Sequence, residues 1–119
     1  MQTKRYTVNF TGLNQEMYTG DNLSRTWERA ADEVYMKEGV YVSARMDLSY
    51  FICGRIRNCQ LGGLSASFMS VWNPTETGTE EDFYNAFIQV VKKVRERLGN
   101  PHMGITIEDI DFYYFVKVE

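Results

Sequence analysis

The sequence is poor in residues that commonly carry catalysis or covalent constraint. Its 119 residues include one histidine, two cysteines and two prolines. The histidine, His102, follows Asn100 and Pro101 in an expected loop, and spacing places no nucleophile beside it, so a catalytic triad is not indicated. Phosphate-loop, metalloprotease and dinucleotide motifs are also absent. With few prolines and no Ser/Gly tract to form a linker, we expect one domain over residues 1–119.

A basic excess and a long apolar run are missing as well. The net charge of −3 disfavours a dominant nucleic-acid or anionic-membrane surface. No segment approaches the ~20 apolar residues of a membrane span. The first ten residues, MQTKRYTVNF, lack the apolar stretch of a signal peptide. We therefore expect a cytoplasmic protein with no membrane partner, for which nucleic acid is a disfavoured ligand.

The two cysteines do not form a recognisable site. On an extended chain, Cys53 and Cys59 would lie up to ~20 Å apart, too far for a disulfide unless a turn intervenes. We predict reduced thiols, and the C-x5-C spacing has no second pair to complete a zinc site. Acidic clusters at 80–82 and 108–111 offer oxygen ligands for Mg²⁺ or Ca²⁺. A helix dipole and a soluble strand edge explain them better, so we expect no metal and no cofactor.

Residues 77–99, TGTEEDFYNAFIQVVKKVRERLG, are typical of one long helix. Thr77 and Thr79 are N-cap residues, and Glu80 completes a capping-box pattern with Thr77. Gly99 supplies a left-handed stop. Acids at the start of the segment and bases at its end suit the helix dipole. Apolar residues at helical spacing predict one buried stripe: Phe83, Phe87, Val90, Val91, Val94 and Leu98.

A second helix is predicted over residues 22–38. Asp21 or Asn22 can cap this helix, and Gly39 can end it. Its inward face is expected to comprise Leu23, Trp27, Ala30, Ala31 and Val34. Alternation of apolar and polar residues predicts strands in six further segments: 4–11, 40–46, 49–57, 64–72, 104–107 and 111–118. A reversal between the second and third of these strands is expected at residues 47–49, and one continuous, bent strand is the alternative.

This order of elements predicts an α+β two-layer sandwich. Two helices would cover one face of a mostly antiparallel sheet of four to five strands. The simplest arrangement is a split β-α-β, or ferredoxin-like, variant with an added strand, in the order β-α-β-β-β-α-β.

Aromatic and aliphatic side chains occur on both faces of two predicted strands. Tyr113 and Phe115 oppose the inward residues of the last strand, and Met69 and Val71 do so in the 64–72 strand. Because two helices can cover only one face, we predict that these four residues form an interaction surface. The basic helix end carries Lys92, Lys93 and Arg95. A solvated helix end explains these charges, and an electrostatic docking surface for an acidic partner is the alternative.

Our first functional hypothesis is a small, non-enzymatic binding protein that acts through this sheet face. Small acidic inhibitors that phages make against host defence share its size and charge. We expect a protein partner, with a homodimer as an alternative. The second hypothesis is a small-molecule-binding protein or minor enzyme, similar to dimeric α+β barrels, with a pocket lined from the following residues: Tyr6, Trp27, Tyr50, Trp72, His102, Tyr113 and Tyr114.

A third hypothesis is single-stranded nucleic-acid binding. The segment VNFTGL, residues 8–13, resembles the first RNA-contacting strand of an RRM domain. The matching strand rich in Lys/Arg, Gly and Phe is missing, and LSASFMSVW, residues 64–72, departs from it at nearly every position. The acidic balance also disfavours this function.

Overall fold

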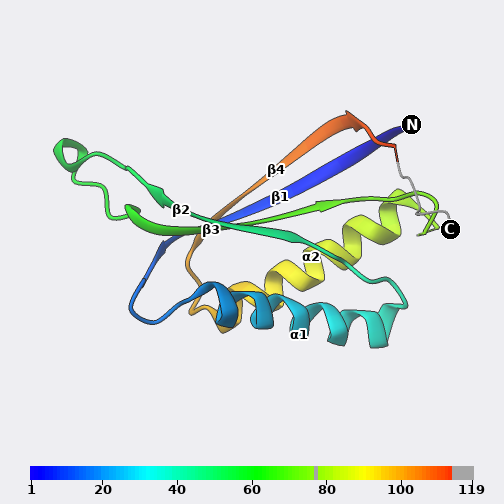
Figure 1. Cartoon of the computed structure of the whole chain (residues 1–119), viewed down its shortest axis with the longest axis horizontal. Helices are drawn as coiled ribbons and strands as arrows, with labels where there is room; N and C mark the ends of the chain where they lie inside the picture. The colour runs from blue at the N-terminus through cyan, green and yellow to red at the C-terminus, as the bar shows by residue number, and fades with distance from the viewer. Residues whose placement is uncertain (77, 114–119) are drawn as a thin grey trace, which may run out of the picture.

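The structure, a computed structural model, describes residues 1–76 and 78–113 and has two layers, with both helices on one face of a sheet (Figure 1). Its elements, in chain order, are β1 (Gln2–Leu13), α1 (Gly20–Glu38), β2 (Arg45–Phe51), the short 3-10 helix η1 (Arg55–Arg57), β3 (Gly63–Val71), α2 (Glu80–Arg97) and β4 (His102–Asp111). The strands are ordered β2-β3-β1-β4, and each neighbouring pair is antiparallel. The predicted two-layer α+β class is therefore confirmed.

The added strand predicted at residues 40–46 does not form. Residues 40–44 have no strand structure, and β2 runs straight through the reversal predicted at 47–49. Val42 is fully buried, and its carbonyl accepts a hydrogen bond from Trp27 Nε1 at 3.1 Å. The apolar alternation of this segment therefore reflects packing against α1, and the element order is β-α-β-β-α-β.

The final strand lies earlier in the sequence than predicted. β4 pairs with β1 from Thr11 opposite His102 to Gln2 opposite Asp111, a longer ladder than the short 104–107 strand that we expected. Phe112 and Tyr113 follow this strand, and the rest of the predicted 111–118 strand lies outside the described residues.

The apolar stripes of both helices are confirmed. All residues predicted for the inward faces of α1 and α2 are buried. The N-cap of α1 is Thr19. Its hydroxyl accepts a hydrogen bond from Asn22 N, and Asn22 Oδ1 accepts one from Thr19 N. The predicted N-caps, Asp21 and Asn22, are therefore wrong and lie within the first turn of the helix. Thr79 caps α2 by accepting from Asp82 N, whereas Thr77 lies outside the described residues.

Aromatic rings join the helices to the sheet. Trp27 of α1 stacks on Phe68 of β3, with ring centroids 4.6 Å apart and planes within 12°. Tyr6 of β1 contacts Phe83 and Phe87 of α2 at centroid distances of 5.7 and 5.3 Å. Such pairs add to the stabilisation that burial of the rings provides, and they fix where α2 lies over β1.

The prediction of two reduced cysteines is wrong, because a disulfide joins Cys53 to Cys59 across a Cα–Cα distance of 5.8 Å. The turn formed by η1 lies between them and brings the cysteines within disulfide reach. This linked loop is the tip of the β2–β3 hairpin, which projects beyond the helices (Figure 1). In the part of the chain that the structure describes, no helix is long and apolar enough to cross a membrane.

Phe87→Ala should lower the free energy of unfolding by about 3–5 kcal/mol, because it removes a fully buried ring that contacts both Tyr6 and Trp27. Urea titration measures the change. Lys92→Ala, at an exposed position of the same helix, is the control and should change stability by no more than about 0.5 kcal/mol. Equal losses in the two variants would contradict the assigned core.

Alkylation tests the disulfide directly. Protein denatured without reductant should resist iodoacetamide at both cysteines, and it should gain two labels after reduction, as measured by intact mass. Labelling of both cysteines before reduction would contradict the linkage.

Candidate functional site

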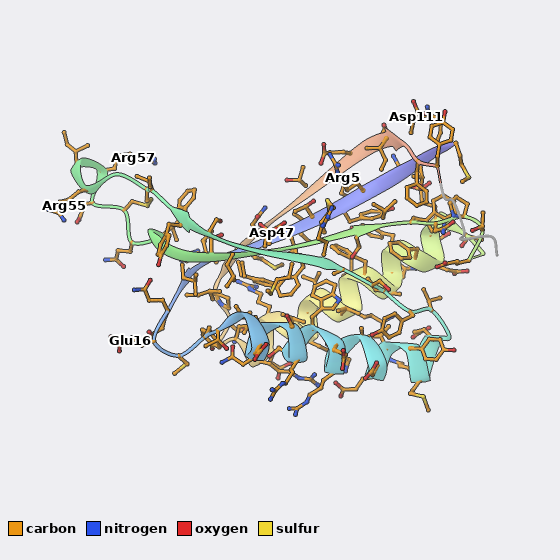
Figure 2. All side chains as sticks on the ribbon, viewed as in Figure 1. Arg5, Glu16, Asp47, Arg55, Arg57 and Asp111 are labelled. Carbon is orange, nitrogen blue, oxygen red and sulfur yellow. A yellow bond between two sulfur atoms is a disulfide. The ribbon has the colours of Figure 1, made fainter. Side chains whose placement is uncertain are left out.

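The open face of the sheet carries Met69 and Val71 as predicted, but most of their neighbours are polar. Across the strands, Val71 pairs with Arg5 and Met69 pairs with Thr7. Arg5 donates to Glu108 through Nε at 3.2 Å and Nη2 at 2.9 Å, and it lies on the side of the sheet away from the helices (Figure 2). The face therefore differs from the aromatic surface that we expected.

The other predicted binding residues are dispersed. Tyr113 lies beyond β4 and is 68% exposed, whereas Phe115 is outside the described residues. Of the basic residues on α2, Lys92 is exposed and Lys93 is half-buried. Arg95 donates from Nε to the carbonyl of Pro101 at 2.9 Å, so it closes the turn between α2 and β4. A docking role for these side chains stays a prediction.

Exposed apolar residues gather instead on the β2–β3 hairpin. Tyr50, Ile52 and Ile56 are 70%, 91% and 99% exposed, and Arg55 and Arg57 lie at the same tip (Figure 2). We had assigned Tyr50 to a pocket lining and had placed Ile52 and Ile56 in a strand. The alternation of apolar and polar residues continues past the end of β2 at Phe51 into the tip of the hairpin. Alternation alone therefore does not show where the paired part of the strand ends.

A hollow at the start of α2 combines aromatic, acidic and basic groups. It has a volume of about 690 Å³, within the usual range of small-molecule sites. We call it the α2 hollow, and its lining is Lys4, Tyr6, Thr79, Glu80, Glu81, Tyr84 and Ile107. A hollow of about 590 Å³ beside α1 is lined by charged residues and Thr26, and one of about 250 Å³ at Trp27 is smaller than typical ligand sites.

Three elements place the lining of the α2 hollow. Lys4 and Tyr6 are two residues apart in β1, so both side chains point to the helix-covered face. Ile107 of β4 is the direct partner of Tyr6. Glu80, Glu81 and Tyr84 lie in the first turns of α2, which Thr79 caps. The contacts of Tyr6 with α2 hold these elements together, as described above.

Tyr6 is the central group of the α2 hollow. Its side chain is 1% exposed, and its hydroxyl has no hydrogen-bond partner among the described residues. Burial, with smaller contributions from Glu80 and Tyr84, raises the pKa of Tyr6 to about 12. The phenol therefore stays protonated at neutral pH and can donate a hydrogen bond to a molecule bound in the hollow.

Lys4 supplies the cation. Its Nζ lies 2.7 Å from Asp109 Oδ1 and 4.0 Å from Glu80 Oε1. The hydrogen bond to Asp109, with the charges of Asp109 and Glu80, raises the pKa of Lys4, so it stays charged. The lining thus carries two carboxylates and one ammonium that already has a carboxylate partner. We infer that the α2 hollow suits a cationic ligand with an apolar or aromatic part.

The sequence alone indicated only part of this lining. Tyr6 was in our pocket prediction, but its other members are scattered: Trp27 is buried under Phe68, and Tyr114 lies outside the described residues. We assigned Glu80 and Glu81 to the helix dipole alone. The missed signal was Lys4, a cation that strand alternation places on the same face as Tyr6, Val8 and Phe10.

Comparison with known proteins identifies the family. A family model described as SAM lyase matches residues 1–116. This chain belongs to the SAM lyase family. Among solved structures, a phage SAM lyase in complex with S-methyl-5'-thioadenosine aligns with a TM-score of 0.59 and 12% identity, covering 90% of this chain and 81% of that one.

Two further structures support the fold of this SAM lyase family member. A phage SAM lyase in the apo state gives a TM-score of 0.57 at 13% identity, covering 91% of this chain and 81% of that chain. A de novo designed protein with a ferredoxin fold gives a TM-score of 0.51 at 10% identity, and the alignment covers 100% of this chain and 96% of that chain. At these identities the likeness concerns the fold. No curated protein matches the chain.

Membership of the SAM lyase family overturns our first functional hypothesis. A family of lyases is a family of enzymes, so the expectation of a non-enzymatic binding protein or inhibitor is wrong. The nucleic-acid hypothesis fails with it. The error came from treating the lack of a histidine, serine or cysteine motif as a lack of catalysis. Such motifs indicate particular mechanisms, and a reaction that needs no protein nucleophile leaves none of them in a sequence.

The ion pair on the open face predicts a pH dependence of stability. Hydrogen bonds from Arg5 hold the pKa of Glu108 below its ordinary value. A carboxyl whose pKa is lowered by folding stabilises the protein above its unfolded-state pKa, and this contribution disappears as the pH falls through the folded-state pKa. In urea titrations at pH 7 and pH 3, Glu108→Gln should therefore lose less stability on acidification than the wild type.

Glu16→Gln is the control for this comparison, because Glu16 is an exposed loop residue with no ion pair in the described structure (Figure 2). It should keep the wild-type response to acid. If Glu108→Gln also keeps it, the pair with Arg5 does not contribute to stability.

Proposed function

We propose that this protein is an enzyme that cleaves S-adenosylmethionine (SAM) and releases S-methyl-5'-thioadenosine in the α2 hollow. The family match over residues 1–116 carries this proposal. One structural relative is a phage SAM lyase bound to S-methyl-5'-thioadenosine, which is the thioether part of SAM. That compound retains the adenosine and the methyl group, so the bond that breaks joins sulfur to Cγ of the methionine portion.

The chemistry of the hollow fits such a substrate. SAM has an aromatic base, a positively charged sulfonium and an amino-acid end with a carboxylate. Tyr84 and Ile107 offer apolar surface for the base, and Glu80 and Glu81 offer negative charge for the cationic groups. The Tyr6 hydroxyl can donate a hydrogen bond to an oxygen or nitrogen of the substrate. These contacts would orient the flexible substrate, which is itself a source of rate enhancement.

The reaction needs little from the protein beyond orientation and charge. When the sulfur–Cγ bond breaks, its electron pair goes to sulfur, and the sulfonium leaves as a neutral thioether. A lyase adds no water, so the remaining fragment leaves in one of two ways. Its own carboxylate attacks Cγ and closes a lactone, or Cβ loses a proton and an alkene forms. The first route requires no external base, which agrees with the sparse catalytic residues of this sequence.

A cytoplasmic location belongs to this proposal. The predicted protein partner and homodimer likewise stay predictions.

The test is to incubate the purified chain with SAM and to separate the products by chromatography and mass spectrometry. We expect S-methyl-5'-thioadenosine and one lactone or alkene fragment. Tyr6→Phe and Glu80→Gln should each lower the rate by about tenfold or more, because each removes a polar contact to the substrate.

Asp82→Asn is the matched control, since Asp82 is also an acid in the first turn of α2 but does not line the α2 hollow. This variant should keep the wild-type rate. Absence of S-methyl-5'-thioadenosine from the wild-type reaction would overturn the proposed activity. Full activity in both Tyr6→Phe and Glu80→Gln would place the active site elsewhere.

A further inference from the structure

We propose that the tip of the β2–β3 hairpin, residues 50–61, is an anchor that binds the surface of an anionic lipid bilayer. The proposal concerns a part of the chain remote from the α2 hollow, and it does not depend on the reaction proposed above. It places one end of the molecule in the interfacial layer of a membrane and leaves the other end in water.

The apolar stripe on one face of β2 extends past the helix that covers it. Met46 and Leu48 lie close to Gly20 at the start of α1. Tyr50 is the next residue on the same face of the strand, yet it is 70% exposed. The hairpin projects beyond both helices at this point (Figure 1). The stripe therefore continues into water, and no helix of the described structure covers its end.

Two isoleucines lie at the outer end of this stripe. Ile52 and Ile56 are 91% and 99% exposed, the largest exposed fractions of any large apolar residue in the described part of the chain. A single exposed apolar residue is ordinary on a protein surface. Two almost fully exposed isoleucines on the same short loop as an exposed tyrosine form a patch of the kind that marks an interaction site.

The charge of the tip identifies the partner as an anionic surface. Arg55 and Arg57 flank Ile56, and both lie at the far end of the hairpin (Figure 2). The sequence has no acidic residue between Asp47 and Glu76, and no carboxylate pairs with either arginine in residues 1–76 and 78–113. The expectation of no membrane partner rested on the net charge of the whole chain, whereas the tip itself is cationic. Arginines close to an anionic bilayer are attracted to its surface.

The backbone of the tip is suited to an environment with little water. Polar backbone groups that enter a bilayer must find hydrogen-bond partners within the protein. In η1, Arg57 N donates to Gly54 O at 3.2 Å, and Asn58 N donates to Arg55 O at 3.0 Å. The disulfide between Cys53 and Cys59 closes this turn. The tip is therefore ordered before it binds, which lowers the entropic cost of binding.

The shape of the tip favours a bilayer over a protein partner. The tip is a protrusion, and no hollow described above includes one of its residues. A bilayer offers phosphates at its surface and an apolar layer directly beneath them at every position. Isoleucine side chains can enter that layer while the arginines beside them remain at the level of the phosphates.

An anchor at this position leaves the α2 hollow open. Lys4 and Tyr6 of the hollow lie near the start of β1, whereas Leu13, at its end, pairs with Leu64 of β3. Leu64 in turn pairs with Tyr50 at the base of the tip. The tip and the hollow therefore lie at opposite ends of the sheet, so a protein bound through the tip can still take a ligand from solution.

The experiment measures flotation of the purified chain with lipid vesicles on a density gradient. Vesicles of phosphatidylcholine with about one quarter phosphatidylglycerol should bind about tenfold or more protein than vesicles of phosphatidylcholine alone. Raising the NaCl concentration from about 0.1 M to about 0.5 M should reduce binding to the anionic vesicles severalfold, because salt screens the arginines.

Two double variants of the tip separate its apolar and its charged contribution. Ile52→Ser with Ile56→Ser should lower the partition constant for anionic vesicles about tenfold or more, because both isoleucines lose their apolar contact with the bilayer. Arg55→Gln with Arg57→Gln should reduce the ratio of binding to anionic and neutral vesicles toward one. All four side chains are exposed, so each variant should fold, which circular dichroism checks.

Matched variants elsewhere on the surface are the controls. Met17→Ser with Met36→Ser removes two apolar side chains that are 62% and 83% exposed, and Arg25→Gln with Arg29→Gln removes two exposed arginines of α1. Both double variants should bind anionic vesicles as the wild type does.

Three results would overturn the anchor. The first is a wild-type chain that floats with neither kind of vesicle, or equally with both. The second is binding that survives the double isoleucine variant, and the third is binding that the control variants lose to the same extent as the tip variants. If the wild-type chain binds no vesicle but is retained on immobilised poly-glutamate through Arg55 and Arg57, the tip contacts an acidic polypeptide and the membrane proposal is wrong.

Discussion

Burial of two amphipathic helices against one face of a single sheet is the constraint on which the structure depends. The apolar stripes of α1 and α2 cannot remain in water, and the face formed by Tyr6, Val8, Phe10 and Phe68 is the surface that covers them. Once α2 is fixed on this face, its first turn must lie beside the start of β1. The position of the α2 hollow is therefore a result of core packing, since the same rings that bury the helix also bring Glu80 to Tyr6.

The elements that sequence reasoning located well are those with a strong local signal. Each helix buries every residue of its predicted stripe, because an amphipathic helix in a two-layer fold has one available orientation. The errors arose where tertiary contacts decide. Val42 alternates like a strand residue, yet it is buried by packing against Trp27. Cys53 and Cys59 are far apart on an extended chain, but the turn at η1 brings them together.

The candidate site was harder to predict than the fold because its residues already had adequate local explanations. Glu80 and Glu81 suit a helix N-terminus, and Tyr6 suits a core strand. Only their joint placement, with Lys4 and Ile107 added from two strands, makes a hollow with a distinct charge. Residues that serve both the fold and a ligand give no separate signal in a single sequence. The identity of the family came from comparison over nearly the whole chain, because no short motif carries it.

The pairing of β1 with β4 has a consequence for synthesis of the chain. Gln2 pairs with Asp111 and Tyr6 with Ile107, so β1 is made well before the strand with which it pairs. Such non-local contacts slow folding, because a long loop must close before they form. Until β4 is made, Tyr6 lacks its strand partner and the hollow lacks the wall that Ile107 provides. Nascent chains that stop before β4 would therefore carry most of the core residues and no complete hollow.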